Sequence, residues 1–332
     1  MPAVTSGKVL VTGANGYIAF WVVKALLEKG YAVRGTVRSG EKGAHLKDVF
    51  KAYGDKLEDG AFDEAVKGVD AIEHTASPFH FNVQDPAELI TPAVAGTGSV
   101  LQSALKFGTD VKRVVILSSC AAVIDSSKPG PTTFSEADWN DYSINEVETK
   151  GRDATPADKY RASKTLAERA AWKFYENNKA QLSWDLVVLN PPFVFGPVLH
   201  AVDSPESLNT SAKDWYNYVL KGKGDENFLV SGGSCWVDVR DLAYAHVLAI
   251  EKEEAAGNRI IVSAGPFKWQ DFVNEARKLA PEILPGNTSY TPGTYPVNYD
   301  TTRAARLLGI TYRSKAETTR DTIADFKQKG WF

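Results

Sequence analysis

The 332-residue chain has little cysteine and no long apolar run, and both shortages restrict its class. Two cysteines far apart in the sequence, Cys120 and Cys235, cannot form a disulfide framework or a cysteine-based metal cluster. The five histidines show no ligand spacing such as His-x-x-x-His, so we expect no metal. No apolar stretch is long enough to span a bilayer, and the first residues lack the apolar core of a signal peptide. We therefore expect a cytoplasmic protein with no membrane contact.

An excess of charge of one sign is also absent. The 38 basic and 41 acidic side chains give a net charge of −3, and Lys and Arg are scattered along the chain. This balance argues against a nucleic-acid partner. Hydrophobic residues make up 43% of the chain, an ordinary globular proportion.

Short apolar runs typical of buried strands alternate with segments of helical periodicity. We expect strands at 9–11, 31–37, 69–74, 114–117 and 186–189, and helices at 17–29, 86–107 and 156–177. This alternation predicts an α/β fold with a doubly wound, parallel Rossmann sheet. The cofactor-binding domain would span 1–190, with elements at about 235–262 returning to it. A smaller substrate-binding lobe would comprise 191–234 and 263–332.

A glycine turn follows the first expected strand and opens the first expected helix. Gly13 permits the tight turn, Gly16 lets the backbone approach a pyrophosphate, and Ala19 allows close packing of helix on strand. The helix N-terminal amides would face the anion. In this strand–turn–helix context the motif indicates a dinucleotide site, and the alternative is an ordinary glycine turn.

The second expected strand ends near Arg38, with Lys42 four residues later. An enzyme that uses NAD usually has an acidic residue here, whereas one that uses NADP tends to have arginine. Arginine can bind the 2′-phosphate bidentately. We therefore expect NADPH as the cofactor; the alternative for both cations, and for Lys42 above all, is a solvated surface charge.

Tyr160 and Lys164 are four residues apart and share one face of an expected helix. Reduction of a carbonyl requires a proton donor, and the ammonium group of Lys164 is expected to lower the pKa of Tyr160. Ser119 follows the strand expected at 114–117, where a hydroxyl can polarise a substrate oxygen. We favour Ser119 over Ser118, for which a capping or turn contact is expected.

Together these segments resemble the extended short-chain dehydrogenase/reductases, and in particular their dihydroflavonol-reductase-like group, which includes the yeast methylglyoxal and aldehyde or ketone reductases. The resemblance covers nearly the whole chain. The matching runs are 11–19 (VTGANGYIA), 35–39 (GTVRS), 74–78 (HTASP), 117–123 (LSSCAAV), 160–167 (YRASKTLA), 189–197 (LNPPFVFGP) and 237–241 (VDVRD).

The resemblance implies an NADPH-dependent reductase of a ketone or aldehyde, with Ser119, Tyr160 and Lys164 as the catalytic triad. It also implies a monomer or a homodimer that acts on a small-molecule carbonyl substrate. The implied cofactor-binding residues are Gly13, Asn15, Gly16, Tyr17, Ile18, Arg38, Lys42, Thr75, Ala76, Ser77, Tyr160, Lys164, Pro191, Val194 and Ser211. The implied substrate pocket contains Phe79, Phe193, Trp215 and Tyr218, for which core packing is the alternative.

One segment departs from the family pattern. Relatives carry a third strand, an apolar run that closes on an aspartate beside the adenine, and residues 54–63 (GDKLEDGAFD) contain no such run. We predict that the third strand is missing or badly shortened. The second strand would then be an exposed edge, and the adenine pocket would lose a wall.

Three other functions are weighed against the reductase. A nucleotide-sugar epimerase or dehydratase has the same fold and Tyr–Lys pair, but it needs basic residues for a diphosphate, and residues 195–220 offer only Lys213. A non-catalytic dinucleotide sensor would commonly lack the tyrosine. Reduction of a cinnamoyl-CoA-type thioester is the alternative within the same chemistry. For Cys120 and Cys235 we expect small buried fillers rather than reactive thiols.

Overall fold

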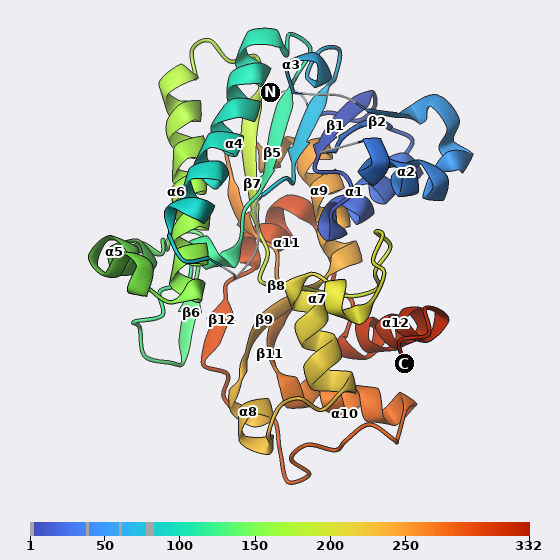
Figure 1. Ribbon diagram of the computed structural model, residues 1–332. Coiled ribbons are helices and arrows are strands. Elements are labelled where there is room, and N and C mark those ends of the chain that lie inside the picture. The colour runs from blue at the N-terminus through green and yellow to red at the C-terminus, as the bar shows by residue number, and fades with distance from the viewer. Residues whose placement is uncertain (1–2, 38–39, 60–61, 78–82) are drawn as a thin grey trace.

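The computed structural model describes residues 3–37, 40–59, 62–77 and 83–332. Its largest sheet has seven strands, each parallel to its neighbours (Figure 1). In spatial order they are β10 (Arg259–Ile261), β7 (Asp185–Asn190), β5 (Arg113–Leu117), β4 (Ala71–His74), β1 (Lys8–Thr12), β2 (Ala32–Thr36) and β3 (Leu57–Asp59). The strand order reverses direction between β1 and β4, which confirms the predicted doubly wound Rossmann sheet.

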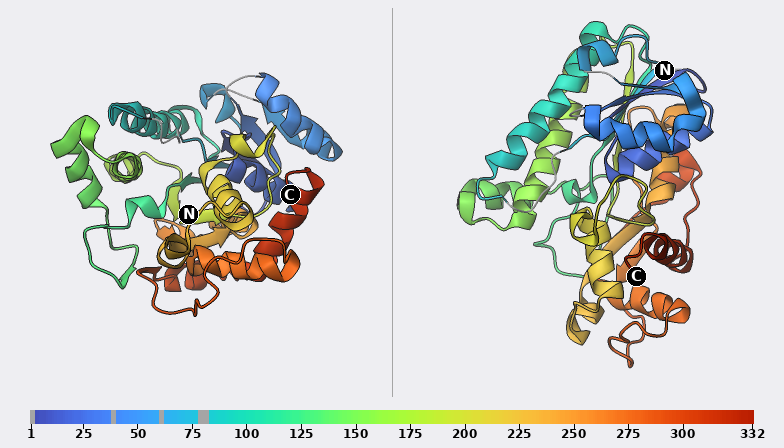
Figure 2. Two further views of the ribbon diagram at one scale, coloured as in Figure 1. Left: turned by 60° about the horizontal axis from the view of Figure 1, so that its bottom comes forward. Right: turned by 45° about the vertical axis from the view of Figure 1, so that its right-hand side comes forward.

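Helices cover both faces of this sheet, which explains the continuous apolar runs of its strands. Val9 and Val11 of β1 pack into one core with α1 (Tyr17–Glu28) and α9 (Val239–Glu251). Leu10 between them packs into a second core with α4 (Ala87–Phe107) and α6 (Pro156–Asn178). Figures 1 and 2 show α4 and α6 side by side on the same side of the sheet. The described helices are α1 (Tyr17–Glu28), α2 (Gly40–Val49), α3 (Phe62–Ala65), α4 (Ala87–Phe107), α5 (Asp141–Lys150), α6 (Pro156–Asn178), α7 (Thr210–Trp215), α8 (Glu226–Ser231), α9 (Val239–Glu251), α10 (Trp269–Leu279), α11 (Thr302–Leu308) and α12 (Lys315–Gln328).

The third strand is short, as the sequence predicts. β3 has only three residues, and they pair with Val33, Arg34 and Gly35 in the middle of β2. The prediction that β2 would be an exposed edge is wrong, because these three residues are enough to cover it. β3 is the edge strand instead.

Two small sheets lie below the large sheet in Figure 1. One contains β8 (Phe193–Phe195), β9 (Gly233–Asp238) and β11 (Gly265–Lys268), and the other pairs β6 (Thr132–Phe134) with β12 (Val297–Tyr299). After β9, the chain returns to the large sheet through α9, which packs against α1, and β10, which pairs with β7. The pairing of β6 with β12 brings together segments from opposite halves of the sequence.

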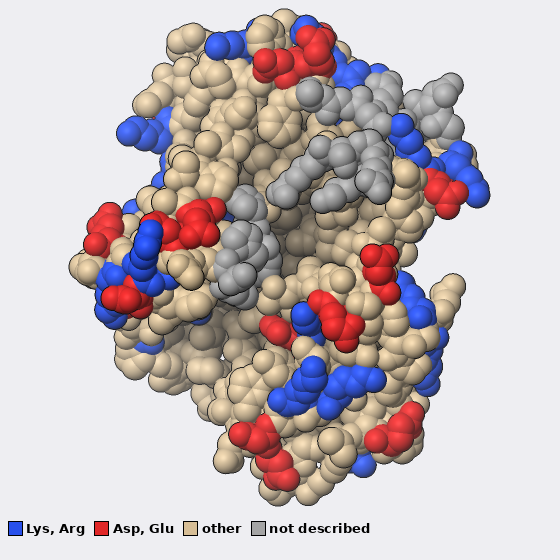
Figure 3. All heavy atoms as spheres, viewed as in Figure 1, with Lys and Arg blue, Asp and Glu red and all other residues tan. Residues whose placement is uncertain are grey.

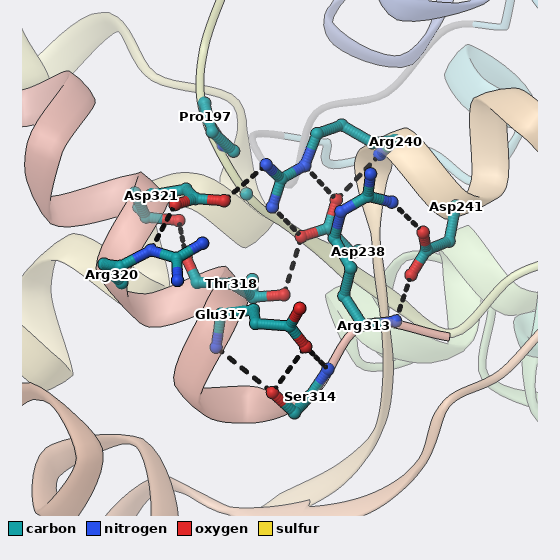
Figure 4. Close-up of polar contacts among 12 residues, drawn as sticks. Pro197, Asp238, Arg240, Asp241, Arg313, Ser314, Glu317, Thr318, Arg320 and Asp321 are labelled. Atoms are coloured by element: carbon teal, nitrogen blue, oxygen red, sulfur yellow. Dashed lines mark hydrogen bonds and ion pairs between the residues drawn. The ribbon is translucent and has the colours of Figure 1, made fainter. Parts of the chain in front are cut away.

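A network of polar contacts holds the C-terminal helix α12 against the start of α9 (Figure 4). The buried carboxylate of Asp238 accepts hydrogen bonds from Arg240 Nε at 2.9 Å and from the Thr318 hydroxyl at 2.6 Å. Arg240 also binds Asp321 of α12 at 2.6 Å. Because Asp238 lies opposite Phe195 in the register of β9 and β8, this network also fixes the end of β8.

Positive and negative side chains are interspersed over the face drawn in Figure 3. This face is hollowed near the middle of the molecule, between the large sheet and α7 (Figures 1 and 3). Within the described ranges, we find no helix with the length and apolarity needed to traverse a bilayer.

Candidate active site

The turn between β1 and α1 contains the glycines expected to face a pyrophosphate. Gly13 has a φ of +65°, and a Cβ at this position would lie 3.1 Å from the backbone of Ala76. The N–H of Gly16 donates to the Gly13 carbonyl at 2.9 Å, and Gly16 precedes α1 without a side-chain cap. The first amides of α1 therefore remain available to an anionic ligand or to water.

A cavity of about 720 Å³ extends from this turn to α7. An uncapped helix N-terminus, a close backbone approach that a Cβ would fill and a cavity of this size together fit a dinucleotide cofactor. The expected cofactor-binding residues that line the cavity are Gly13, Gly16, Tyr17, Ile18, Thr75, Ser77, Tyr160, Lys164, Pro191, Val194 and Ser211.

The other four expected cofactor-binding residues are not among those that line the cavity. Ala76 lies against the turn, where its N–H donates to the Thr12 hydroxyl at 3.1 Å. Asn15 is in the turn itself and is partly exposed. Arg38 lies outside the described residues, and only the backbone of Lys42, in α2, is described.

The three expected catalytic residues meet beside this cavity. Ser119 follows β5 by two residues at the carboxyl edge of the sheet, while Tyr160 and Lys164 lie one turn apart on α6. The side chains of Ser119 and Tyr160 are joined by a hydrogen bond. A smaller cavity of about 270 Å³ is also lined by Ser119 and Tyr160. This pair therefore lies where the two cavities meet.

Burial is the largest influence on the pKa values of Tyr160 and Lys164. It raises the pKa of Tyr160 to about 12, and the hydrogen bond from Ser119 opposes that rise. Burial also lowers the pKa of Lys164 to about 8, against the negative charge of Glu168. The expectation that the pKa of Tyr160 is lowered is therefore wrong for this structure, because desolvation of the phenolate is the largest effect and raises that pKa.

Ser118 and Ser119 make different contacts from those expected. The Ser119 hydroxyl accepts the N–H of Ala121 at 3.1 Å, so Ser119 forms the capping contact. Ser118 instead donates its hydroxyl to the buried carboxylate of Glu168 at 2.6 Å. The expectation of a capping or turn contact for Ser118 is wrong, because a buried acceptor lies within its reach.

Of the four expected substrate-pocket aromatics, Phe193 lines the smaller cavity. Trp215 is 1% exposed and packs against Phe326, so it belongs to the core and does not line either cavity. The ring of Tyr218 lies 4.9 Å from that of Trp269 and is likewise not among the residues that line them. Phe79 lies outside the described residues.

Sequence reasoning missed three chemically distinct residues of the smaller cavity, Arg161, Asp214 and Tyr299. Burial raises the pKa of Asp214 to about 6. Asp214 lies three residues after Ser211 on α7, and this helical spacing was the signal that could have identified it. Tyr299 reaches the cavity because β12 pairs with β6, a long-range contact that no local pattern reveals.

The part of the chain that the structure describes contains no group of three or more His, Cys, Asp or Glu side chains able to hold a metal. Cys120 and Cys235 are both buried free thiols, which confirms that they are small fillers. Burial raises the pKa of Cys235 to about 12 and the pKa of Cys120 well above its usual range. Neither thiol is activated as a nucleophile.

Comparison with known proteins assigns the family. Residues 9–265 match the NAD dependent epimerase/dehydratase family. An NADPH-dependent methylglyoxal reductase of Saccharomyces cerevisiae is 35% identical over 339 residues, which cover 95% of this chain and 97% of that protein. A ketoreductase of Aspergillus niger is 35% identical over 342 residues, which cover 97% of this chain and 98% of that protein.

Solved structures agree with these sequence matches. The yeast methylglyoxal/isovaleraldehyde reductase complexed with NADPH has a TM-score of 0.84 at 31% identity, covering 98% of this chain and 100% of that one. A UDP-glucuronic acid 4-epimerase from Bacillus cereus has a TM-score of 0.71 at 16% identity, which shows a shared fold alone. The chain therefore belongs to the NAD dependent epimerase/dehydratase family, that is, to the extended short-chain dehydrogenase/reductases that its sequence resembles.

Proposed function

We propose that this protein is an NADPH-dependent carbonyl reductase that converts an aldehyde or a ketone into the alcohol. The observation that carries the proposal is the hydrogen-bonded pair of Ser119 and Tyr160 at the junction of two cavities. The larger cavity fits a dinucleotide, and the smaller one, at about 270 Å³, fits a small carbonyl compound. The yeast relative named as an NADPH-dependent methylglyoxal reductase and the fungal relative named as a ketoreductase support the same chemistry.

Several groups of residues would hold the cofactor, which when bound supplies the hydride for the carbonyl carbon. The turn at residues 13–18, including Asn15, would bind the pyrophosphate through backbone amides. Residues 75–77 would lie beside the ribose. The nicotinamide end would lie against Pro191 and Val194, and Ser211 would reach a phosphate of the cofactor. We also assign Arg38 and Lys42 to the 2′-phosphate.

The protein's own groups would manage the proton and the negative charge. Tyr160 stays protonated at neutral pH, since burial raises its pKa to about 12, and it donates its proton to the substrate oxygen. The Ser119 hydroxyl donates a hydrogen bond to the same oxygen. Lys164 stabilises the phenolate that Tyr160 becomes after proton transfer. The product is an alcohol, with one hydrogen on carbon from the cofactor and one on oxygen from Tyr160.

We divide the chain accordingly into a cofactor-binding domain of residues 1–190, joined by elements at about 235–262, and a substrate-binding lobe of residues 191–234 and 263–332. The lobe contributes Phe193, Asp214 and Tyr299 to the smaller cavity, which supports its role in substrate binding. Two buried free thiols fit a reducing compartment, so we also propose a cytoplasmic location.

The proposal is tested by measuring oxidation of NADPH, with NADH in parallel, against a small panel of carbonyl compounds. The panel contains methylglyoxal, isovaleraldehyde, a β-keto ester, an aryl ketone and a dihydroflavonol. We expect turnover with NADPH and little with NADH. In the variant Arg38→Asp the preference should move toward NADH, because the cation expected at the 2′-phosphate is lost. A folded protein without turnover on any of these compounds would contradict the proposal.

A further inference from the structure

A single buried carboxylate lies behind the catalytic residues. Glu168 is on α6, one turn after Lys164, and is 1% exposed. Its Oε2 accepts hydrogen bonds from the Ser118 hydroxyl at 2.6 Å and from Asn190 Nδ2 at 2.8 Å. Its Oε1 accepts one from Arg259 Nε at 2.5 Å. Glu168 thus connects the ends of β5 and β7 and the start of β10 to the helix that carries Tyr160 and Lys164.

Two of these partners also hold the backbone of Ser119. Ser118 is its neighbour in the chain, and Asn190 Nδ2 donates a second hydrogen bond, at 3.1 Å, to the Ser119 carbonyl. The peptide that carries Ser119 is therefore fixed from two directions by groups that share one carboxylate, that of Glu168. Asn190 Oδ1 has no partner, but the hydrogen bonds of Asn190 Nδ2 and of the Glu168 carboxylate form a buried network that restrains the residues it joins.

The charge of Glu168 is balanced unequally by its two cationic neighbours. Arg259 binds it directly, but the Arg259 guanidinium also donates to backbone carbonyls, including that of Asp138 at 2.5 Å and that of Ala122 at 3.1 Å. Lys164 forms no hydrogen bond with Glu168, yet the negative charge of the carboxylate opposes the lowering of the Lys164 pKa by burial. The ammonium form of Lys164 is stabilised by this negative charge one helical turn away.

We propose that Glu168 is a positioning residue of the reaction, which fixes Ser119 through Ser118 and Asn190 and keeps Lys164 protonated. The inference rests on the proposed reductase activity, in which Lys164 acts as a cation. Without the charge of Glu168, less would oppose the effect of burial on the pKa of Lys164. That pKa would fall, and Lys164 would lose its proton at lower pH.

The test is the pH profile of kcat/KM for reduction of a carbonyl substrate by wild type and Glu168→Gln. In the wild type, activity should fall above about pH 8, where Lys164 is deprotonated. Glutamine keeps the size of the side chain without the charge. The alkaline limb should move down by about one pH unit, which corresponds to about ten-fold lower activity on that limb. A direct NMR titration of Lys164 in the cofactor-free protein should show the same downward shift.

A matched control separates positioning from the loss of a buried ion pair as such. Arg113 and Asp185 form a fully buried pair, 2.6 Å apart, at the N-terminal ends of β5 and β7, whereas Ser118 and Asn190 lie at their carboxyl ends. Asp185→Asn should destabilise the fold to a degree comparable to Glu168→Gln, yet leave the alkaline limb in its wild-type position. An unmoved limb in Glu168→Gln, or an equal shift in Asp185→Asn, would overturn the inference.

Two further variants keep the test decisive if Glu168→Gln folds poorly. The double variant Glu168→Gln/Arg259→Met removes both charges of the pair and avoids an unpaired buried cation. It should show the same downward shift. Glu168→Asp keeps the charge but shortens the side chain, so its kcat should fall while the limb stays near the wild-type position. If the wild type is active but the alkaline limb of Glu168→Gln does not move, the role of Glu168 is refuted and the proposed function stands. If the wild type turns over no carbonyl compound, the proposed function is refuted. The NMR titration of Lys164 would then decide whether Glu168 keeps Lys164 protonated.

Discussion

Ser119 and Tyr160, 41 positions apart in the sequence, share a hydrogen bond at the junction of the cofactor-sized cavity and the smaller cavity. The carboxyl end of β5 carries the serine and the N-terminal half of α6 carries the tyrosine. In open α/β sheets, ligands bind outside the carboxyl ends of the strands. In the proposed mechanism the pair would supply the two groups that carbonyl reduction requires, a proton donor and a hydrogen-bond donor for the same oxygen.

Replacement of Tyr160 by phenylalanine should remove the proton donor and little else. We expect kcat to fall by about 10²–10⁴-fold, the usual contribution of general acid catalysis. Affinity for NADPH, measured by fluorescence titration, should stay close to that of the wild type, because the ring and the helix remain. Ser119→Ala should lower kcat by less. Wild-type turnover in Tyr160→Phe would remove Tyr160 from the mechanism.

Asp214 should discriminate against anionic substrates. Its pKa of about 6 means that the side chain becomes charged as the pH rises through that value. In the wild type, kcat/KM for an α-keto acid relative to the matching α-keto aldehyde should therefore fall as the pH rises through about 6. Like charges in a shared site repel strongly, so Asp214→Asn should raise this ratio about ten-fold at high pH.

The ratio of the two substrates isolates the charge of Asp214. Lys164, whose pKa is about 8, keeps its charge around pH 6, and Arg161 lines the same cavity in wild type and variant. In Asp214→Asn the ratio should be independent of pH in this range. A ratio that still falls through about pH 6 in the variant would assign the discrimination to another group.

Gly13 should be intolerant of a side chain. Its φ of +65° disfavours alanine, and the added Cβ would lie 3.1 Å from Ala76. We expect Gly13→Ala to lower the free energy of unfolding by about 1–2 kcal/mol and to weaken NADPH binding. Gly98, inside α4 with open space where a Cβ would lie, is the matched control. Gly98→Ala should stabilise by about 0.5–1 kcal/mol without affecting the cofactor, measured by chemical denaturation.

Trp215 and Phe193 should behave as a core residue and a pocket residue, respectively. Trp215→Phe removes part of a buried ring, so we expect a loss of about 1–3 kcal/mol in the free energy of unfolding with unchanged relative activity across the carbonyl panel. Phe193→Leu changes the wall of the smaller cavity and should alter the order of preferred substrates. Reordered preferences in Trp215→Phe with none in Phe193→Leu would reverse the two assignments.

Local patterns were sufficient to predict the glycine turn and the helical pair that line the larger cavity. The turn at Gly13 and Gly16 is encoded by neighbouring residues, and the Tyr160–Lys164 spacing lies on a single helix. The missing apolar run before Phe62 also predicted the short β3. These features depend on contacts between residues that are close in sequence.

Long-range packing decided what the sequence could not predict. Tyr299 enters the smaller cavity only through the pairing of β12 with β6, and Trp215 is turned into the core by its contact with Phe326. The role of Glu168 depends on partners from three separate strands or strand ends. Likewise β2 is covered by β3 because three residues can still pair with it.

The most direct test of the proposed reaction is the fate of the hydride. NADPH labelled with deuterium at nicotinamide C4 is incubated with the protein and an accepted carbonyl substrate, and the alcohol is analysed by mass spectrometry and NMR. We predict one deuterium per alcohol, bonded to the former carbonyl carbon. The label is placed on each of the two faces of C4 in turn. Alcohol that contains no deuterium with either labelled cofactor, or no alcohol at all, would contradict the proposed hydride transfer.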